Sequence, residues 1–341
     1  MLVDAHLDLA YNAIRGRAVT QPANAQTPDE DGTPSVGLPD LRNGQLNLIC
    51  GTIFCMPHLG DAITGYKTPD QAHAAAQQQI QWYHHQEQAR ELRLIRHADD
   101  LQDLLSDTRN PKPETRNPPL PALIILMEGA DPIRTPAEAA DWFNAGVRAV
   151  GLAWKQTRYA GGTGHPGPLT PEGIQLVHEL DALGIIHDVS HLAEQSFWQL
   201  LDIASGPVMA SHSNCRAIVP TDRQLSDDMI RALASRGGVI GINFYDKFLL
   251  PPGEYGTRPA SLADVVRHIR HVCDLTGSAN HVGIGTDMDG GFGAEHLPAE
   301  IRTSADLPRL ADALSASEFT DAHIHAVLAG NWTQFFQRSV S

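Results

Sequence analysis

Side chains that could bind a metal recur where short apolar runs of the sequence end. His6 and Asp8 stand at the end of the first run, Glu128 ends a later one, and His191 and His212 each follow another. Imidazole and carboxylate donors with no cysteine among them form the ligand set of a hydrolytic, zinc-type centre that keeps open coordination positions. We therefore expect these five residues to form a metal site if the fold brings the ends of the runs together.

Each of these residues, taken alone, also permits a structural interpretation. His6 and Asp8 are two positions apart on an extended segment, so their side chains leave the same face and could hold one cation. Glu128 follows the apolar sequence LIILM, where a carboxylate is costly unless it is paired or metal-bound, and a buried salt bridge is the alternative. His191 and His212 could each be a hydrogen-bonded core histidine. The convergence of all five favours the metal site.

A sixth polar group, Asp287, lies in the sequence GTDMDGG after another apolar run. Its carboxylate could be a further metal ligand. Alternatively, it could take a proton from a metal-bound water and later give it to a leaving amine.

The elements that must position these residues are predicted as eight strands alternating with helices. We expect strands at 2–8, 46–54, 122–128, 148–154, 184–190, 207–212, 238–244 and 281–287. Near-continuous apolar runs are typical of parallel strands buried on both faces. The order predicts a (β/α)8 TIM barrel of the metal-dependent hydrolase type, whose active site lies at the carboxyl ends of the strands. Residues 1–341 are expected to form one domain, with surface insertions near 20–37 and 107–121.

Capping signals support the predicted helices. Thr170 precedes Pro171 at the start of a helix that should end near Gly184, and Ser261 with Asp264 forms an acidic capping box. A closing helix with a second helical segment after residue 330 is expected at the C-terminus.

Composition limits the classes of partner. The 341 residues hold 25 Lys and Arg against 40 Asp and Glu, a formal net charge of -15, which argues against binding to nucleic acid or an anionic membrane. No secretory leader or membrane-spanning stretch is recognised, so we expect a cytoplasmic protein. The four cysteines form no CxxC pair and indicate neither a disulfide framework nor a thiolate zinc site. The 17 histidines are conspicuous because histidine is the commonest metal ligand.

Several segments in the same order resemble the membrane (renal-type) dipeptidase family, the M19 metallopeptidases of the amidohydrolase superfamily. The similarity extends from about residue 3 to residue 335, and its most specific part is SHSNCRAIVPTDRQLSDD. The other matching segments are DAHLDLA, MEGAD, HDVSHL, GVIGINFY, GIGTDMDGG and LAGNW.

The resemblance implies a barrel that holds two zinc ions. By that resemblance His6, Asp8 and Glu128 would bind one ion, and Glu128, His191 and His212 the other, so that Glu128 bridges the two. A bridging hydroxide would attack the peptide carbonyl, while both ions polarise the reactants. The resemblance further assigns Asp287 as the general acid and base. It also assigns Arg223, in TDRQLSD, to the C-terminal carboxylate of a dipeptide, a task suited to a forked guanidinium.

One departure from the family pattern concerns the end of the fourth predicted strand. Better-known animal members have a histidine there that helps to hold the carbonyl oxygen, whereas this sequence has Trp154. His165, in the following loop, is the candidate replacement. The resemblance also implies a homodimer, although no stripe in the sequence marks an interface.

Three functional hypotheses follow, and the leading one is a zinc-dependent dipeptidase with tolerance for a D-residue at the C-terminal side. The second is another amidohydrolase reaction, on N-acyl amino acids or cyclic amides. The third is a catalytically silent metal- or ligand-binding barrel, which only the departure at Trp154 favours. Side-chain preference and the native metal stay open, because sites of this ligand type accept several divalent ions.

Overall fold

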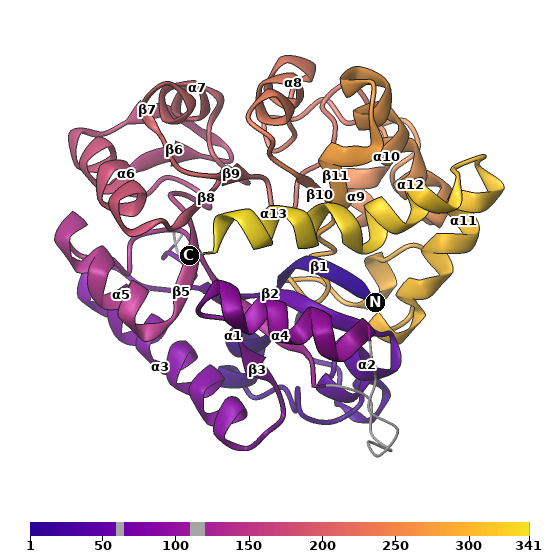
Figure 1. Ribbon diagram of the computed structural model, residues 1–341, viewed down its shortest axis with the longest axis horizontal. Helices are drawn as coiled ribbons and strands as arrows, with labels where there is room; N and C mark the ends of the chain where they lie inside the picture. The colour runs from indigo at the N-terminus through magenta and orange to yellow at the C-terminus, as the bar shows by residue number, and fades with distance from the viewer. Residues whose placement is uncertain (59–64, 110–119, 341) are drawn as a thin grey trace.

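Eight parallel strands form a ring in the computed structural model, which describes residues 1–58, 65–109 and 120–340 (Figure 1). The order around the ring follows the chain, and β1 pairs with both β2 and β11. A bridge between Ala210 and Ile240 completes the ring between β9 and β10. The strands are β1 (Leu2–Leu7), β2 (Leu46–Phe54), β4 (Ala122–Glu128), β5 (Val147–Gly151), β8 (Ile186–Asp188), β9 (Val208–Met209), β10 (Ile240–Ile242) and β11 (Val282–Ile284). The predicted (β/α)8 barrel is confirmed.

Helices surround the ring, as predicted. The α-helices are α1 (Leu9–Ile14), α2 (Leu38–Asn43), α3 (Pro69–Gln88), α4 (Ala98–Arg109), α5 (Ala139–Ala145), α6 (Pro171–Leu183), α7 (Glu194–Ile203), α8 (Asp227–Ser235), α9 (Asp246–Leu249), α10 (Leu262–Thr276), α11 (Leu310–Ala316), α12 (Asp321–His325) and α13 (Asn331–Ser339). The hydroxyl of Thr170 accepts a hydrogen bond from the backbone N–H of Gly173 at 3.0 Å, and α6 ends at Gly184 with φ 69°. The backbone N–H of Ser261 donates to Asp264 at 2.9 Å, which confirms the second capping prediction.

Alternation along β4 explains why Glu128 faces the barrel interior. Ala122, Ile124 and Leu126 belong to the apolar cluster inside the ring, whereas the residues between them pack outward against the helices. Successive side chains of a strand point to opposite faces, so the even-numbered series of β4 continues inward to Glu128. The last residue of this strand is therefore a buried carboxylate at the carboxyl end of the barrel.

Helix α13 closes the opposite, amino-terminal end of the barrel and crosses the centre of the ring in Figure 1. Trp332, Phe335 and Phe336 join the apolar cluster inside the strands. The indole N–H of Trp332 donates to the carbonyl of Ile284 at 3.0 Å. A Cβ at Gly283 would lie 2.3 Å from the indole nitrogen, so this packing requires a glycine there.

The expected insertion at 20–37 is a connection that contains the short 3-10 helix η1 (Ala23–Ala25) and is fixed to the end of the barrel. The backbone N–H groups of Ser35 and Val36 donate to the Asp289 carboxylate at 2.9 and 3.0 Å. Arg17 holds Asp29 through two hydrogen bonds of 2.6 Å. Most of the second expected insertion, 107–121, lies outside the described residues.

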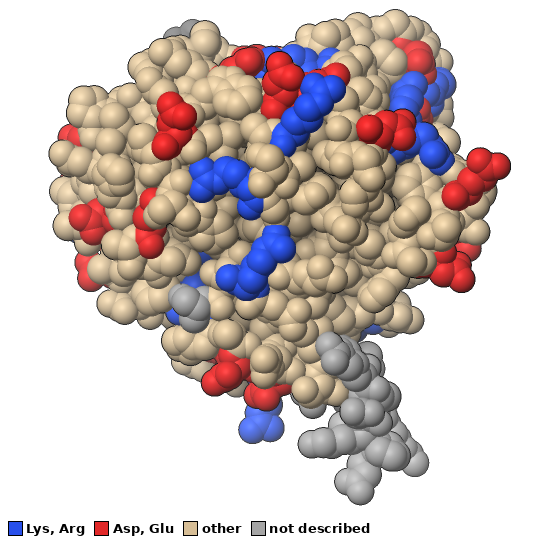
Figure 2. Space-filling model, turned by 45° about the horizontal axis from the view of Figure 1, so that its top comes forward, with Lys and Arg blue, Asp and Glu red and all other residues tan. Residues whose placement is uncertain are grey.

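Two features of the whole molecule bear on its surroundings. Among the helices of the described ranges, none combines the length and the apolar character needed to cross a bilayer. On the face shown in Figure 2, Lys and Arg side chains occur in separate small groups, several of them beside Asp or Glu.

Candidate active site

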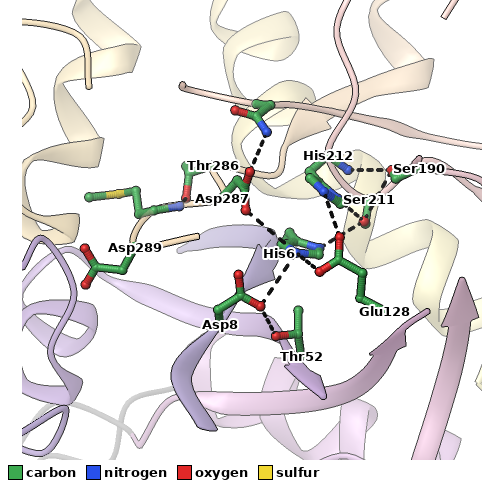
Figure 3. Close-up of polar contacts among 12 residues, drawn as sticks. His6, Asp8, Thr52, Glu128, Ser190, Ser211, His212, Thr286, Asp287 and Asp289 are labelled. Carbon is green, nitrogen blue, oxygen red and sulfur yellow. Dashed lines mark hydrogen bonds and ion pairs between the residues drawn. The ribbon is translucent and has the colours of Figure 1, made fainter. Parts of the chain in front are cut away.

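The barrel gathers the predicted ligands at the carboxyl ends of its strands. His6 lies in β1 and Asp8 directly after it, and Glu128 is the last residue of β4. His191 follows β8 and His212 follows β9, each by three residues. Figure 3 shows His6 between the carboxylates of Asp8 and Glu128, with the ring of His212 beside it.

Glu128 lies between two groups of potential ligands. Its Oε2 is 3.5 Å from Nε2 of His6, which is also 4.0 Å from the nearer oxygen of Asp8. Its Oε1 lies 3.3 Å from Nε2 of His191 and 3.4 Å from Nε2 of His212. Within each group of three, one ligand atom per residue lies within 4.8 Å of the others. Each carboxylate oxygen therefore faces a different group, the arrangement expected of a bridging ligand.

Ser211 orients two of the histidines. Its hydroxyl lies 2.5 Å from Oδ2 of Asp188, 3.2 Å from Nδ1 of His6 and 2.7 Å from Nδ1 of His212. A hydroxyl has one proton, and the carboxylate of Asp188 can only accept it. Both imidazoles therefore donate from Nδ1 to the Ser211 oxygen, which leaves Nε2 of each ring as the atom that can bind a metal ion. Nδ1 of His191 is likewise tied, at 2.9 Å, to the hydroxyl of Thr163.

The residues fit a pair of metal ions. Nε2 of His6 is buried and has no hydrogen-bond partner. Nε2 of His191 lies only 3.0 Å from Nε2 of His212, so two basic nitrogens converge beside the Glu128 carboxylate. Buried polar atoms normally have partners, and convergent imidazole nitrogens beside carboxylates are what a divalent cation requires.

Asp287 is held at the edge of this cluster by an unusual backbone conformation. Its φ of 60° is in the left-handed region, as is the φ of 66° at His191, and such strain in non-glycine residues concentrates at functional sites. Asn243 donates to Oδ2 of Asp287 at 2.8 Å, while Oδ1 faces Nε2 of His6 at 3.8 Å. A Cβ at Gly290 would lie 2.1 Å from Oδ1, so the glycine leaves room for the carboxylate.

The crowding of carboxylates shifts the proton affinities of the cluster. Burial, together with the charges of Asp8 and Glu128, raises the pKa of Asp287 to about 8 against the opposing effects of His6 and Arg223. Burial alone would lower the pKa of His6, but Glu128, Asp8 and Asp287 outweigh burial and raise it to about 10. Burial lowers the pKa of His191 well below its ordinary value. In the metal-free cluster Asp287 therefore holds its proton more tightly than an ordinary carboxyl group.

Arg223 lines the same cavity. The side chain is buried, donates from Nη2 to the carbonyl of His212 at 2.6 Å and from Nη1 to Ser213 at 3.2 Å. Its Nε is buried without a hydrogen-bond partner, and the guanidinium lies 5.4 Å from the ring centroid of Phe248. An unsatisfied guanidinium N–H in a cavity is suited to an anion.

The cavity has a volume of about 1250 Å³ and opens above the metal-ligand cluster. Asp8, Glu128, His191, Arg223 and Asp287 line it together with aromatic side chains. Among these, Trp154 packs edge-on against Phe54 with ring centroids 5.3 Å apart. His165 lies exposed on β7 (His165–Leu169) and is absent from the described residues that line the cavity. The candidate oxyanion donor is therefore not brought to the site.

Several supporting residues were not predicted from the sequence. Asp188 and Ser211 stand at the predicted strand ends beside His191 and His212, but their role depends on hydrogen bonds across neighbouring strands. Asn243 lies in GVIGINFY, and Gly290 lies in GTDMDGG. Asn243 could have been noticed in the sequence as a polar residue that directly follows an apolar run. Sequence alone could not show that it contacts Asp287.

Comparison with known proteins agrees with this geometry. The family model described as membrane dipeptidase (peptidase family M19) matches residues 1–339. An uncharacterized protein of Klebsiella pneumoniae is 36% identical over 223 residues, covering 62% of this chain and 79% of that protein. A dipeptidase of Clonostachys rogersoniana is 33% identical over 175 residues, covering 50% of this chain and 43% of the relative. The match therefore covers less than half of the Clonostachys rogersoniana dipeptidase.

Two solved structures are similar over nearly the whole chain. A dipeptidase described as a metallopeptidase of family M19 has a TM-score of 0.82 and 27% identity, covering 99% of this chain and 98% of its own. A metallopeptidase of Rhodobacter sphaeroides, bound to a phosphinate mimic of L-Ala-D-Ala, has a TM-score of 0.82 and 26% identity, covering 99% of both chains.

Proposed function

The chain belongs to the membrane dipeptidase family, peptidase family M19, whose members are metallo-dipeptidases, and on this premise we propose that it hydrolyses dipeptides with two zinc ions. The observation that carries the proposal is the position of Glu128, whose two carboxylate oxygens face separate groups of ligands. His6 and Asp8 would complete one metal site, and His191 and His212 the other. When bound, the two ions would polarise the peptide carbonyl and lower the pKa of the attacking water.

Asp287 would move the proton in this reaction. Its Oδ1 is free of the hydrogen bond that fixes Oδ2 and faces the metal-ligand cluster at His6. The carboxylate accepts a proton from the attacking water and then gives it to the amine that leaves. Asn243 keeps the carboxylate oriented through both steps.

Arg223 would hold one end of the substrate, and an acidic group that binds the free ammonium at the other end would limit the substrate to two residues. Its guanidinium would bind the C-terminal carboxylate, which places the preceding peptide bond beside the Glu128 cluster. Free L-residues and D-residues both present that carboxylate. Tolerance for a D-residue at this end is supported by the Rhodobacter sphaeroides relative, which binds a mimic of L-Ala-D-Ala.

A substrate panel on zinc-reconstituted protein tests the proposal. We expect hydrolysis of L-Ala-L-Ala and L-Ala-D-Ala, none of tripeptides, and about two equivalents of zinc per chain by elemental analysis. Chelation should abolish turnover and zinc should restore it. Hydrolysis of N-acetylated amino acids without hydrolysis of free dipeptides would show a different amidohydrolase reaction. Turnover that survives exhaustive chelation would contradict the role of the metal.

A further inference from the structure

Lysine is rare in this chain, and its distribution is uneven. The sequence contains only Lys67, Lys112, Lys155 and Lys247. Lys112 lies outside the described residues, and the other three all line the cavity above the metal-ligand cluster. The lining comprises thirty described residues, fewer than a tenth of the chain. Every lysine that the structure describes is therefore at the candidate active site of a protein whose net charge is -15.

None of these three ammonium groups forms an ion pair with a residue that the structure describes. The described residues provide an acidic partner within 4.0 Å for many arginines, but for none of the three lysines. Lys155 is half-buried, with Nζ 5.3 Å from the ring centroid of Trp154, and Lys67 and Lys247 are exposed. By contrast, Arg15 in the same cavity already pairs with Glu30 and Asp31. The lysines are thus the cations that the cavity leaves available to a ligand.

The three lysines come from different βα connections and approach the site from different sides. Lys247 in α9 precedes Phe248, whose ring lies under the guanidinium of Arg223. Lys155 follows Trp154, whose ring centroid is 6.1 Å from that of His191. Lys67 follows Tyr66, on the connection after β2. The three lysines therefore reach the cavity lining from three separate connections of the barrel.

We propose that the cavity selects dipeptides that carry a side-chain carboxylate in addition to the C-terminal one. The inference rests on the proposed function, because Arg223 and the metal site must hold the backbone of the dipeptide. Once they do, an Asp or Glu side chain would lie among ammonium groups that have no other counter-ion. The other acidic groups of the lining are those of the metal-ligand cluster, Glu30 and Asp31 beside Arg15, and Asp222, which accepts a hydrogen bond from the backbone N–H of Gly164. Ammonium groups on long, flexible stems can follow side chains of either length.

Matched pairs of substrates test this selection. L-Ala-L-Glu is compared with L-Ala-L-Gln, and L-Glu-L-Ala with L-Gln-L-Ala, on zinc-reconstituted protein. The members of each pair have the same shape and differ in one charge. We expect the ratio of kcat/KM, acid over amide, to exceed about five in at least one pair. The ratio should fall when ionic strength rises from about 0.02 M to about 0.5 M, because salt screens the attraction.

Substitution of the lysines tests whether they cause the preference for acidic dipeptides. Lys67→Met, Lys155→Met and Lys247→Met are each expected to lower the ratio about two- to fivefold, and the triple variant should bring it close to one. Arg302→Met is the matched control, because Arg302 is exposed and absent from the lining, and the ratio should not change. Calorimetric binding of acidic and amide phosphinate mimics of the dipeptides gives a second readout and should show the same order.

The outcomes separate this inference from the proposed function. Hydrolysis of the amide and acidic dipeptides at equal rates would overturn the charge selection and leave the dipeptidase activity standing. A high ratio that persists in the triple variant would overturn the assignment to the lysines. If none of the four dipeptides is hydrolysed, both the proposed function and the charge selection are overturned.

Discussion

At the scale of single residues, Ser211 has an influence that its small side chain does not suggest. Its hydroxyl donates to Asp188 and accepts from two histidines of different strands. One oxygen thereby fixes the tautomer of one histidine in each proposed metal site. Residues that orient ligands in this way commonly affect metal affinity almost as strongly as the ligands themselves.

Ser211→Ala should therefore weaken zinc binding without removing a ligand. We expect the dissociation constant to rise about ten- to hundredfold, measured by competition with a chromophoric chelator. Ser235→Ala is a suitable control, since Ser235 is exposed on α8 and bonds only to its own helix. Equal zinc affinity in Ser211→Ala and the unaltered protein would show that the imidazoles are oriented by other contacts.

The protons held by the cluster predict how the metal-free protein responds to pH. The pKa of His6 is raised to about 10 and that of Asp287 to about 8, so the folded state binds more protons than the unfolded state above pH 6.5. Stability from His6 is complete below pH 6.5 and is lost as the pH rises through about 10. Stability from protonated Asp287 is lost as the pH rises through about 8. Both groups therefore lower the free energy of unfolding as the pH rises.

The melting temperature of the metal-free protein should accordingly fall between pH 6.5 and pH 9. His191 and His212, whose pKa values are lowered, act in the opposite direction only below pH 6.5. Asp287→Asn should reduce the fall between pH 6.5 and 8, and zinc should reduce it further because a cation replaces the protons. A melting temperature that is level or rises over this range would contradict the assigned proton affinities.

At the scale of elements, α13 closes the barrel on the side away from the site. Trp332→Ala should lower the free energy of unfolding by about 3–5 kcal/mol, because it removes a large buried ring and leaves a cavity. The hydrogen bond to Ile284 would be lost with the ring. Urea denaturation measures the effect, with Gln334→Ala, exposed on the same helix, as the control. A loss no greater than in the control would mean that α13 is not needed to close the barrel.

The elements also show what could be predicted from the sequence. All eight barrel strands were predicted, because strands buried on both faces have long apolar runs. The hairpin of β6 (Ala160–Gly162) and β7 was not predicted, because its sequences AGG and HPGPL contain the residues least typical of strands. Strand β3 (Arg93–Leu94) has two residues and pairs only with β4. The sequence TPAE at 135–138 has the spacing of a capping box, but it forms a short 3-10 helix without a side-chain cap.

As with the fold, the sequence predicts part of the site. Ligand-type residues at strand ends indicate a common location, because the topology of a parallel barrel brings all those ends together. Hydrogen bonds between strands, such as those of Ser211, depend on register and distance, which the sequence does not contain. The lysines required the structure for a different reason. They lie on connections after β2, β5 and β10, and only the closed ring directs these connections toward one cavity.

At the scale of the whole molecule, net charge is a poor guide to the ligand. The chain is acidic overall, yet all acidic groups of the described cavity lining except Asp222 belong to the metal-ligand cluster or to the pairs of Arg15. The remaining lining residues include three lysines and the buried Arg223. Local charge distribution, more than the total, determines which ions a cleft attracts.

The position of β1 between β2 and β11 also constrains the order in which the site can be made. The carbonyl of His6 accepts a hydrogen bond from the backbone N–H of Asp287 at 3.2 Å, and Asp4 is aligned with Ile284 across β1 and β11. A ribosome releases His6 and Asp8 first and Asp287 only when little of the chain is left to translate. Until β11 has been translated, one edge of β1 has no partner strand. The ring is therefore still open beside His6 and Asp8. The ring, and with it the full cluster around His6 and Asp287, is therefore closed only after β11 has been translated.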